Sequence, residues 1–300
     1  MSSLRERLIL DQVLVADGAT GTNLQDLGLP AGAQTEDWIF EHPERILELE
    51  KQFVDAGADI ILTCTFGATA IRMKGSKHAG KVEDLNVRAA SLGREAVGES
   101  GGLVGGSMGP LGQLLKPYGP VEYEAATAAY AEQAAALHKG GVDLLVIETQ
   151  FSLDEAKAAL EGARAVTDLP AVVSFSYDRG MRTMMGVTPD AAAAMFRNLG
   201  ADLIGVNCGT TLENARAVVQ EYAAAVAGFP IWVKPNAGLP RVEGSKTVYD
   251  VTPSNMAEFA RSAVELGARV VGGCCGSTPA HVRAIAAALK SASRESAPDK

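Results

Sequence analysis

The sequence LGADLIGVNC at residues 199–208 decides the fold. Gly200 can adopt the left-handed conformation that ends a helix, and a short apolar strand follows at once. The same pattern, a glycine at the end of a helix followed by the start of a strand, recurs at residues 56–59, 140–143 and 266–269. This recurrence predicts a chain in which helices and strands alternate, which is the pattern of an α/β protein with a parallel sheet.

Eight short runs rich in valine, isoleucine and leucine are spaced along the chain. Such runs are typical of strands that are buried on both faces of a parallel sheet. The predicted strands are Val13–Asp17, Asp59–Thr65, Gly102–Ser107, Asp143–Glu148, Pro170–Ser176, Asp202–Asn207, Pro230–Asn236 and Arg269–Cys274.

Amphipathic stretches between these runs predict helices. The clear ones are Pro43–Ala56, Glu122–Lys139, Leu153–Val166, Pro189–Leu199, Leu212–Val226, Ser254–Leu266 and Pro279–Leu289. The weakest unit is the second, where we expect a glycine- and lysine-rich loop over Ile71–Val82 and then a helix near Val82–Val97.

Eight strands in this order predict a (β/α)8 TIM barrel in a single domain. A doubly wound open sheet is the alternative, but eight regular units fit a closed barrel better. We expect the barrel to span residues 13–290. Residues 1–12 would form an N-terminal helix or extension, and residues 291–300 a loose C-terminal tail.

Composition excludes several classes of function. With 36 acidic and 27 basic side chains the net charge is −9, which argues against a nucleic-acid partner and against binding to anionic membranes. No apolar run approaches the roughly 20 residues that span a bilayer, and the N-terminus lacks the apolar centre of a signal peptide. Four cysteines in 300 residues do not form a disulfide scaffold, so we expect a cytoplasmic, reducing location.

Three cysteines lie at the carboxyl ends of strands, which is where the active-site residues of a barrel are found. Cys208 follows the sixth strand, and Cys274 and Cys275 end the eighth. Three thiolates and one exchangeable position fit a catalytic Zn²⁺ site. The alternative is that these are ordinary buried cysteines, which behave as small hydrophobic residues. We interpret Cys64, alone at the end of the second strand, as structural.

Two carboxylates share this rim. Asp17 and Glu148 would either pair with a substrate ammonium group or act as a general base, while the simpler alternative is that they cap turns and bind backbone amides. The small-residue loop that contains Gly18 and Thr20 offers backbone N–H groups to a carboxylate.

Two residues at the end of the seventh strand leave alternatives open. Asn236 could bind a metal through its amide oxygen or donate a hydrogen bond. Lys234 raises a rival hypothesis, a Schiff-base lysine as in barrel aldolases. The proline that follows it and the nearby thiols make that chemistry the weaker alternative.

The segments DGATGT at residues 17–22 and GGCCGSTPAH at residues 272–281, with Asn207-Cys208 upstream, resemble the homocysteine S-methyltransferase family. Its barrel is shared by betaine– and S-methylmethionine–homocysteine methyltransferases and by the homocysteine module of cobalamin-dependent methionine synthase. PNAGLP at residues 235–240 looks most like that module. The chain departs from the family pattern at Cys64, and the segment that begins Asn207-Cys208-Gly209 lacks the usual proline after the cysteine.

The resemblance implies roles for named residues. Cys208, Cys274 and Cys275 would be zinc ligands, and Asn236 would supply the oxygen that the substrate thiol displaces. Asp17 and Glu148 would hold the homocysteine ammonium group, and the loop around Gly18 together with Ser107 would hold its carboxylate.

The implied activity is zinc-dependent transfer of a methyl group to the homocysteine thiol, giving methionine. The donor suggested by the methionine synthase likeness is a methylcorrinoid, such as methylcobalamin, carried by a separate protein, because no corrinoid domain is expected in this chain. Betaine or S-methylmethionine as the donor remains an alternative. So does an accessory module that binds homocysteine or docks a corrinoid protein without turning over alone.

Overall fold

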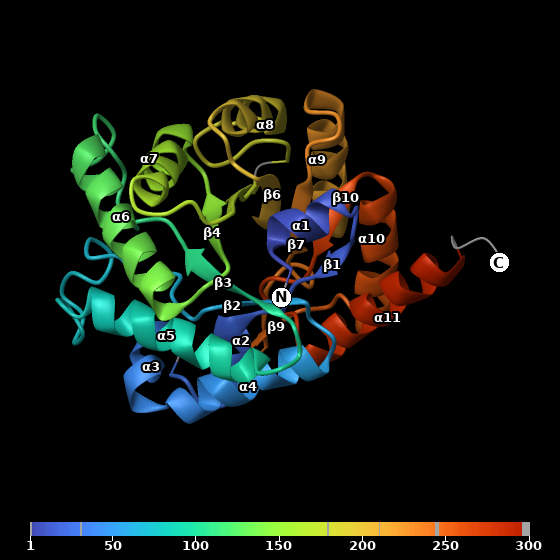
Figure 1. Ribbon diagram of the computed structural model, residues 1–300, viewed down its shortest axis with the longest axis horizontal. Helices are drawn as coiled ribbons and strands as arrows, with labels where there is room; N and C mark the ends of the chain where they lie inside the picture. The colour runs from blue at the N-terminus through green and yellow to red at the C-terminus, as the bar shows by residue number, and fades with distance from the viewer. Residues whose placement is uncertain (1, 31, 179, 210, 244–245, 296–300) are drawn as a thin grey trace.

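The structure is a computed structural model that describes residues 2–30, 32–178, 180–209, 211–243 and 246–295 (Figure 1). Eight parallel strands form one sheet in the order β1-β10-β7-β6-β5-β4-β3-β2. A parallel bridge between Ala16 and Ile60 joins the first strand to the last and closes the sheet. The predicted (β/α)8 barrel is therefore confirmed. The strands are β1 Leu14–Val15, β2 Ile60–Leu62, β3 Leu103–Met108, β4 Leu144–Gln150, β5 Ala171–Phe175, β6 Leu203–Cys208, β7 Ile231–Pro235 and β10 Ala268–Val271.

Helices surround the barrel in Figure 1. They are α2 Thr20–Asp26, α3 Trp38–Glu41, α4 Pro43–Asp55, α5 Val82–Val97, α6 Tyr123–Gly140, α7 Leu153–Arg164, α8 Pro189–Asn198, α9 Leu212–Ala225, α10 Pro253–Glu265 and α11 Pro279–Glu295. The weakest predicted helix is confirmed, since α5 has the expected bounds. None of the helices in the described ranges is long and apolar enough to cross a membrane.

Two predicted boundaries differ from the structure. The stretch around Gly18 to Thr22, expected as a loop, becomes helical at Thr20, where α2 begins. The loose tail expected from residue 291 is helical as far as Glu295, because α11 continues past the predicted barrel boundary. Residues 296–300 of that tail lie outside the described residues.

The repeated pattern seen in the sequence has a structural cause. Its glycines adopt positive φ angles of 101°, 91°, 80° and 106° at Gly57, Gly141, Gly200 and Gly267. In three of the four repeats an aspartate then opens the next strand and accepts a backbone N–H bond from the strand beside it. The pairs are Asp59 with Val15 at 2.8 Å, Asp143 with Val104 at 2.7 Å, and Asp202 with Ala171 at 2.8 Å. Each repeat therefore ends a helix and helps fix the register of two neighbouring strands.

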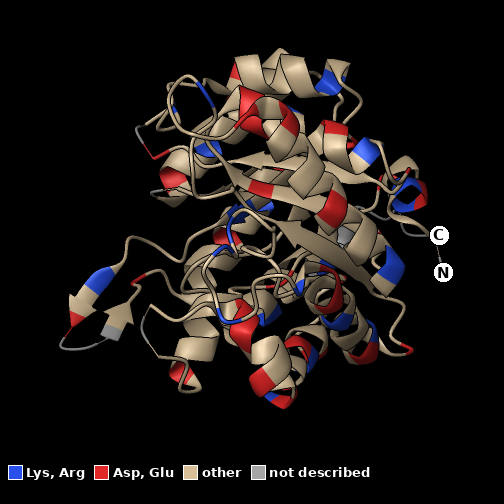
Figure 2. Cartoon of the chain, turned by 90° about the vertical axis from the view of Figure 1, so that its left-hand side faces the viewer, with Lys and Arg blue, Asp and Glu red and all other residues tan. Residues whose placement is uncertain are grey.

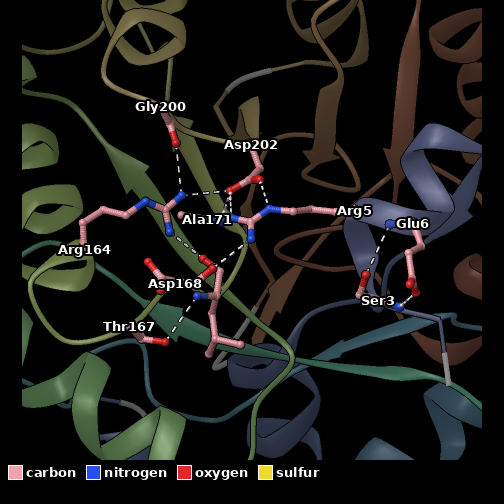
Figure 3. A network of polar contacts seen from close by, with 10 residues as sticks. Ser3, Arg5, Glu6, Arg164, Thr167, Asp168, Ala171, Gly200 and Asp202 are labelled. Carbon is pink, nitrogen blue, oxygen red and sulfur yellow. Dashed lines mark hydrogen bonds and ion pairs between the residues drawn. The ribbon is translucent and has the colours of Figure 1, made fainter.

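A short N-terminal helix, α1 Leu4–Ile9, closes the end of the barrel where the strands begin. Leu4 is fully buried and packs with Trp232 and the other side chains of the barrel interior. Figure 3 shows how the next residue holds the helix in place. The Arg5 guanidinium pairs with Asp202 at 2.5 Å and donates to the Asp168 carbonyl at 2.9 Å. The opposite end of the barrel, where the strands end, remains open.

An antiparallel hairpin that the sequence analysis did not predict follows β7. Its strands are β8 Arg241–Glu243 and β9 Lys246–Val248. Figure 2 shows these two short strands standing away from the barrel. The chain then returns to the barrel, where the Val251 N–H donates to the Ala237 carbonyl at 2.9 Å.

Candidate metal centre and substrate pocket

A pocket of about 340 Å³ opens at the carboxyl ends of the strands. Most of the side chains that the sequence singled out line it, namely Gly18, Thr20, Ser107, Glu148, Cys208, Lys234, Cys274 and Cys275. Asp17 and Asn236 are not part of its described lining. Both are nevertheless buried, with 1% and 9% of their surface exposed.

The three predicted cysteines meet at one side of this pocket. The Cys208 Sγ lies 3.0 Å from that of Cys274 and 3.9 Å from that of Cys275, and all three sulfurs lie within 4.8 Å of one another. Tetrahedral zinc with Zn–S bonds of about 2.3 Å places its sulfur ligands about 3.8 Å apart. The Cys208–Cys275 distance of 3.9 Å matches this spacing, and the Cys208–Cys274 distance of 3.0 Å is shorter than it. The set of three thiols fits a zinc ion that retains one free position.

The backbone directs these thiols toward one point. Cys208 ends β6 with a φ of 55°, a conformation that non-glycine residues adopt at a cost of about 1 kcal/mol or more. The Cys274 N–H donates to the Pro235 carbonyl at 2.7 Å, and the Cys275 carbonyl accepts from Ala237 at 2.8 Å. The end of β7 thus holds the cysteine pair beside β6.

The thiols polarise one another. Hydrogen bonds from the Cys208 and Cys274 thiols lower the pKa of Cys275 to about 3. Hydrogen bonds to Cys274 and Cys275, together with burial, raise the pKa of Cys208 well above its usual range. One thiolate stabilised by two neighbouring thiols is a good starting point for binding a cation, since metal ligation requires the deprotonated sulfur.

Asn236 follows β7 and has an unused acceptor. Its Nδ2 donates to the Gly209 carbonyl at 3.1 Å, next to Cys208. Its Oδ1 is buried and has no partner among the described residues. A buried amide oxygen without a partner is costly, so this atom is available to a cation or to a substrate group.

Glu148 is the carboxylate that faces the pocket. Its Oε1 accepts from the Ser107 hydroxyl at 2.5 Å and its Oε2 from the Asn207 amide at 3.5 Å. Burial raises the pKa of Glu148 to about 7, although Lys234 opposes this shift. A carboxyl group held in one orientation, with room for another donor, suits recognition of an ammonium group.

Asp17 has a different setting. Its Oδ2 accepts from the Leu62 N–H at 2.7 Å, and its Oδ1 forms an ion pair with the Lys234 ammonium group. Burial raises the pKa of Asp17, while Lys234 opposes the rise. For Lys234, burial alone would lower the pKa, but attraction by Asp17 and Glu148 raises it. A lysine kept charged in this way is a poor Schiff-base nucleophile, which weakens the aldolase hypothesis.

Two polar side chains near the site had no role in the sequence analysis. Asn207 bridges β4 and β6, since its Oδ1 accepts from the Thr149 N–H at 2.9 Å while its Nδ2 reaches Glu148. Tyr249 follows the hairpin and packs against Gly276, and burial together with the neighbouring thiols raises its pKa to about 12. The Asn-Cys dipeptide could have drawn attention to Asn207. Nothing in the sequence indicated that the chain after the hairpin brings Tyr249 back to the site.

Cys64 lines the pocket but stands apart from the other cysteines. Burial raises the pKa of its thiol well above the usual range, with a further contribution from Glu36. It is not among the three residues whose sulfurs cluster. These observations are in keeping with the structural role that the sequence suggested.

Comparisons with known proteins agree with this geometry. The family model for homocysteine S-methyltransferase matches residues 14–289. The methionine synthases of Mycobacterium leprae and Mycobacterium tuberculosis are 34% and 33% identical over 94% and 96% of this chain. The chain spans only about a quarter of their length, 24% and 25%.

A solved structure matches over nearly its whole length. The metallated form of the homocysteine methyltransferase MmuM from Escherichia coli superposes with a TM-score of 0.78 at 27% identity, covering 94% of this chain and 98% of that one. Together with the family match, which covers the entire barrel, this likeness leads to one conclusion: the chain belongs to the homocysteine S-methyltransferase family.

Proposed function

We propose that this protein is a zinc-dependent methyltransferase that moves a methyl group onto the thiol of homocysteine and so forms methionine. The observation that carries the proposal is the convergence of Cys208, Cys274 and Cys275 on one side of an open pocket. Three free thiols in this arrangement fit the reducing cytoplasm expected from the sequence.

The three cysteines would hold the zinc ion, and the Asn236 Oδ1 would be its oxygen ligand before substrate binds. Bound zinc would lower the pKa of the acceptor thiol, so that the sulfur enters the reaction as a nucleophilic thiolate. No separate general base is then required of Asp17 or Glu148. The protein's part is to fix the position and direction of the acceptor sulfur.

The pocket residues would bind the amino-acid end of homocysteine. Glu148 would accept hydrogen bonds from the ammonium group, held in place by Ser107 and Asn207. The substrate carboxylate would lie near Gly18, Thr20 and Ser107, where the lining is made of small residues and α2 begins. The first N–H groups of a helix have no partner within it and can bind an anion. This placement leaves the thiol end free to reach the cysteines.

For the methyl donor, we propose a methylcorrinoid such as methylcobalamin, held by a separate protein. The support is the likeness to the two methionine synthases, at 33–34% identity over nearly the whole barrel. A second candidate is a diffusible donor, betaine or S-methylmethionine. It is favoured by the match to 98% of the MmuM chain, because that homocysteine methyltransferase is hardly larger than the barrel.

A donor panel tests the proposal. Purified protein would be analysed for zinc and assayed for methionine formation from homocysteine with methylcobalamin, betaine or S-methylmethionine. We expect about one zinc per chain and turnover with at least one donor. Active protein without zinc would overturn the metal role. Zinc and homocysteine binding without turnover, even with a methylated corrinoid protein, would instead indicate an accessory module.

A further inference from the structure

The floor of the pocket contains a buried ion pair that occupies one of the two carboxylates expected to bind substrate. Lys234 and Asp17 have side chains that are 3% and 2% exposed, and the lysine ammonium group contacts the Asp17 Oδ1 directly. The other Asp17 oxygen accepts the Leu62 N–H. Both oxygens of Asp17 are therefore engaged before any substrate enters.

The position of Lys234 follows from strand alternation. Successive side chains of a strand point to opposite faces. In β7, Trp232 belongs to the cluster inside the barrel and Val233 to the cluster between sheet and helices. Lys234 accordingly points inward, where it spans the width of β10 to reach Asp17 at the end of β1.

The pair changes the charge that an acceptor meets. Lys234 lines the pocket together with Glu148, whereas Asp17 is buried and is not among the lining residues. Two free carboxylates would offer an ammonium group two charge-assisted hydrogen bonds, which are the strong kind. Here the lysine supplies the ammonium group for Asp17, and only the Glu148 carboxylate is open to the substrate.

We propose that Lys234 sets the acceptor selectivity of this pocket. By neutralising Asp17, it leaves Glu148 as the single carboxylate for an α-ammonium group, so the pocket discriminates only modestly against thiols that carry a carboxylate but no amino group. The inference rests on the proposed function, because it concerns the acceptor of the same site. The class of additional acceptor is an ω-mercapto carboxylate.

Calorimetry with methionine and 4-(methylthio)butanoate, its analogue without the amino group, tests the inference without a methyl donor. Both ligands are thioethers, so their sulfur does not titrate. One charge-assisted hydrogen bond corresponds to about a ten- to hundredfold preference. We expect wild-type protein to prefer methionine by less than about a hundredfold, and a larger preference would overturn the proposal.

The variant Lys234→Met keeps an unbranched side chain that is one atom shorter, removes the ammonium group and so releases Asp17. Its preference for methionine should rise by about tenfold or more over wild type, because two carboxylates then receive the ammonium group. The matched double variant Asp17→Asn/Lys234→Met should return to the wild-type preference. An unchanged or smaller preference in Lys234→Met would contradict the proposal. If Lys234→Met does not fold, the test rests on the wild-type protein, whose preference for methionine must be below about a hundredfold.

The proposed function and this inference fail in different ways. Wild-type protein that binds neither methionine nor homocysteine would remove the proposed function. Wild-type protein that binds both, combined with a Lys234→Met variant of unaltered preference, would remove the inference alone. A purely structural role of the ion pair would weaken both ligands equally and leave their ratio unchanged.

Discussion

The Cys208 Sγ lies 3.0 Å from the Cys274 Sγ, although 66 residues separate the two along the chain. Cys208 ends β6 and Cys274 follows β10, and β7 lies between these strands in the sheet. The contact is made across the top of β7, where the Pro235 carbonyl accepts the Cys274 N–H. The parallel pairing of β6, β7 and β10 therefore assembles a donor set that neither segment could form alone.

Replacing one of these thiols should remove the metal. In Cys275→Ser we expect zinc content to fall well below one equivalent and methyl transfer to fall by more than about a hundredfold, since loss of a ligand should exceed the 10–100-fold cost of losing an outer-shell partner. Metal analysis and the donor assay measure both. Serine keeps the size of the side chain but is not a thiolate donor.

Cys64→Ser is the matched control for that substitution. Cys64 lines the same pocket, but its sulfur is not part of the cluster and burial keeps its thiol protonated. This variant should retain full zinc content. Loss of zinc in Cys64→Ser, or one equivalent retained in Cys275→Ser, would contradict the assignment of ligands.

Binding of the amino-acid end should depend on pH through Glu148. Burial raises the pKa of its carboxyl group to about 7, so the group loses its charge as pH falls below that value. We expect methionine affinity to be constant above pH 7 and to weaken toward about tenfold per pH unit below it. Calorimetry between about pH 5.5 and 8.5, a range that brackets the pKa of Glu148, follows this change.

The same pKa shift has a consequence for stability. Because the folded-state pKa lies above the ordinary value of 4.5, the native protein holds this proton more tightly than the unfolded chain does. The stability contributed by Glu148 is full below pH 4.5 and is lost as pH rises through 7. Glu148→Gln should therefore gain stability relative to wild type as pH rises, and its methionine affinity should no longer change near pH 7.

The parts of the fold that were predictable are those with a local cause. The glycine at 200 and the aspartate at 202 mark a helix end and a strand start through their own conformations and hydrogen bonds. The cysteines at the strand ends were predictable because barrel geometry brings strand ends together. The metal they would bind remains a prediction.

The remaining features depend on partners that are distant in sequence. The Lys234–Asp17 pair joins residues 217 positions apart, so no local pattern could show that the lysine takes the place expected for a substrate ammonium group. The strands β8 and β9 have three residues each and β8 is exposed throughout, so they lack the apolar run by which a strand is identified. The reach of α11 to Glu295 was hidden by a polar sequence that also suits a tail.

The N-terminal helix should contribute to stability and not to catalysis. Leu4 is fully buried at the closed end of the barrel, far from the cysteines, so Leu4→Ala should lower the free energy of unfolding by about 2–4 kcal/mol. Ile9 in the same helix is 82% exposed, and Ile9→Ala should change it by less than about 0.5 kcal/mol. Denaturant unfolding gives both values. Unequal kcat values for folded Leu4→Ala and wild type would argue against this division.

Gly18 should tolerate no side chain, because it packs against the turn that follows the cysteine pair. A Cβ atom at Gly18 would lie 2.6 Å from the Ser277 carbonyl oxygen and 2.7 Å from the Phe53 ring. The Ser277 carbonyl also accepts the Ala19 N–H at 3.0 Å, so the two loops would have to separate. Gly18→Ala should cost about 1–3 kcal/mol of stability and weaken zinc binding, as measured by unfolding and by competition with a chelator.

Gly21→Ala is the matched control for Gly18→Ala. The nearest atom to a Cβ there is the Thr35 methyl group at 3.7 Å, and the residue lies within α2, where alanine is favoured over glycine by about 0.5–1 kcal/mol. This variant should be as stable as wild type or more so and should bind zinc equally well. Equal behaviour of the two alanine variants would mean that the contact between Gly18 and Ser277 does not position the cysteines.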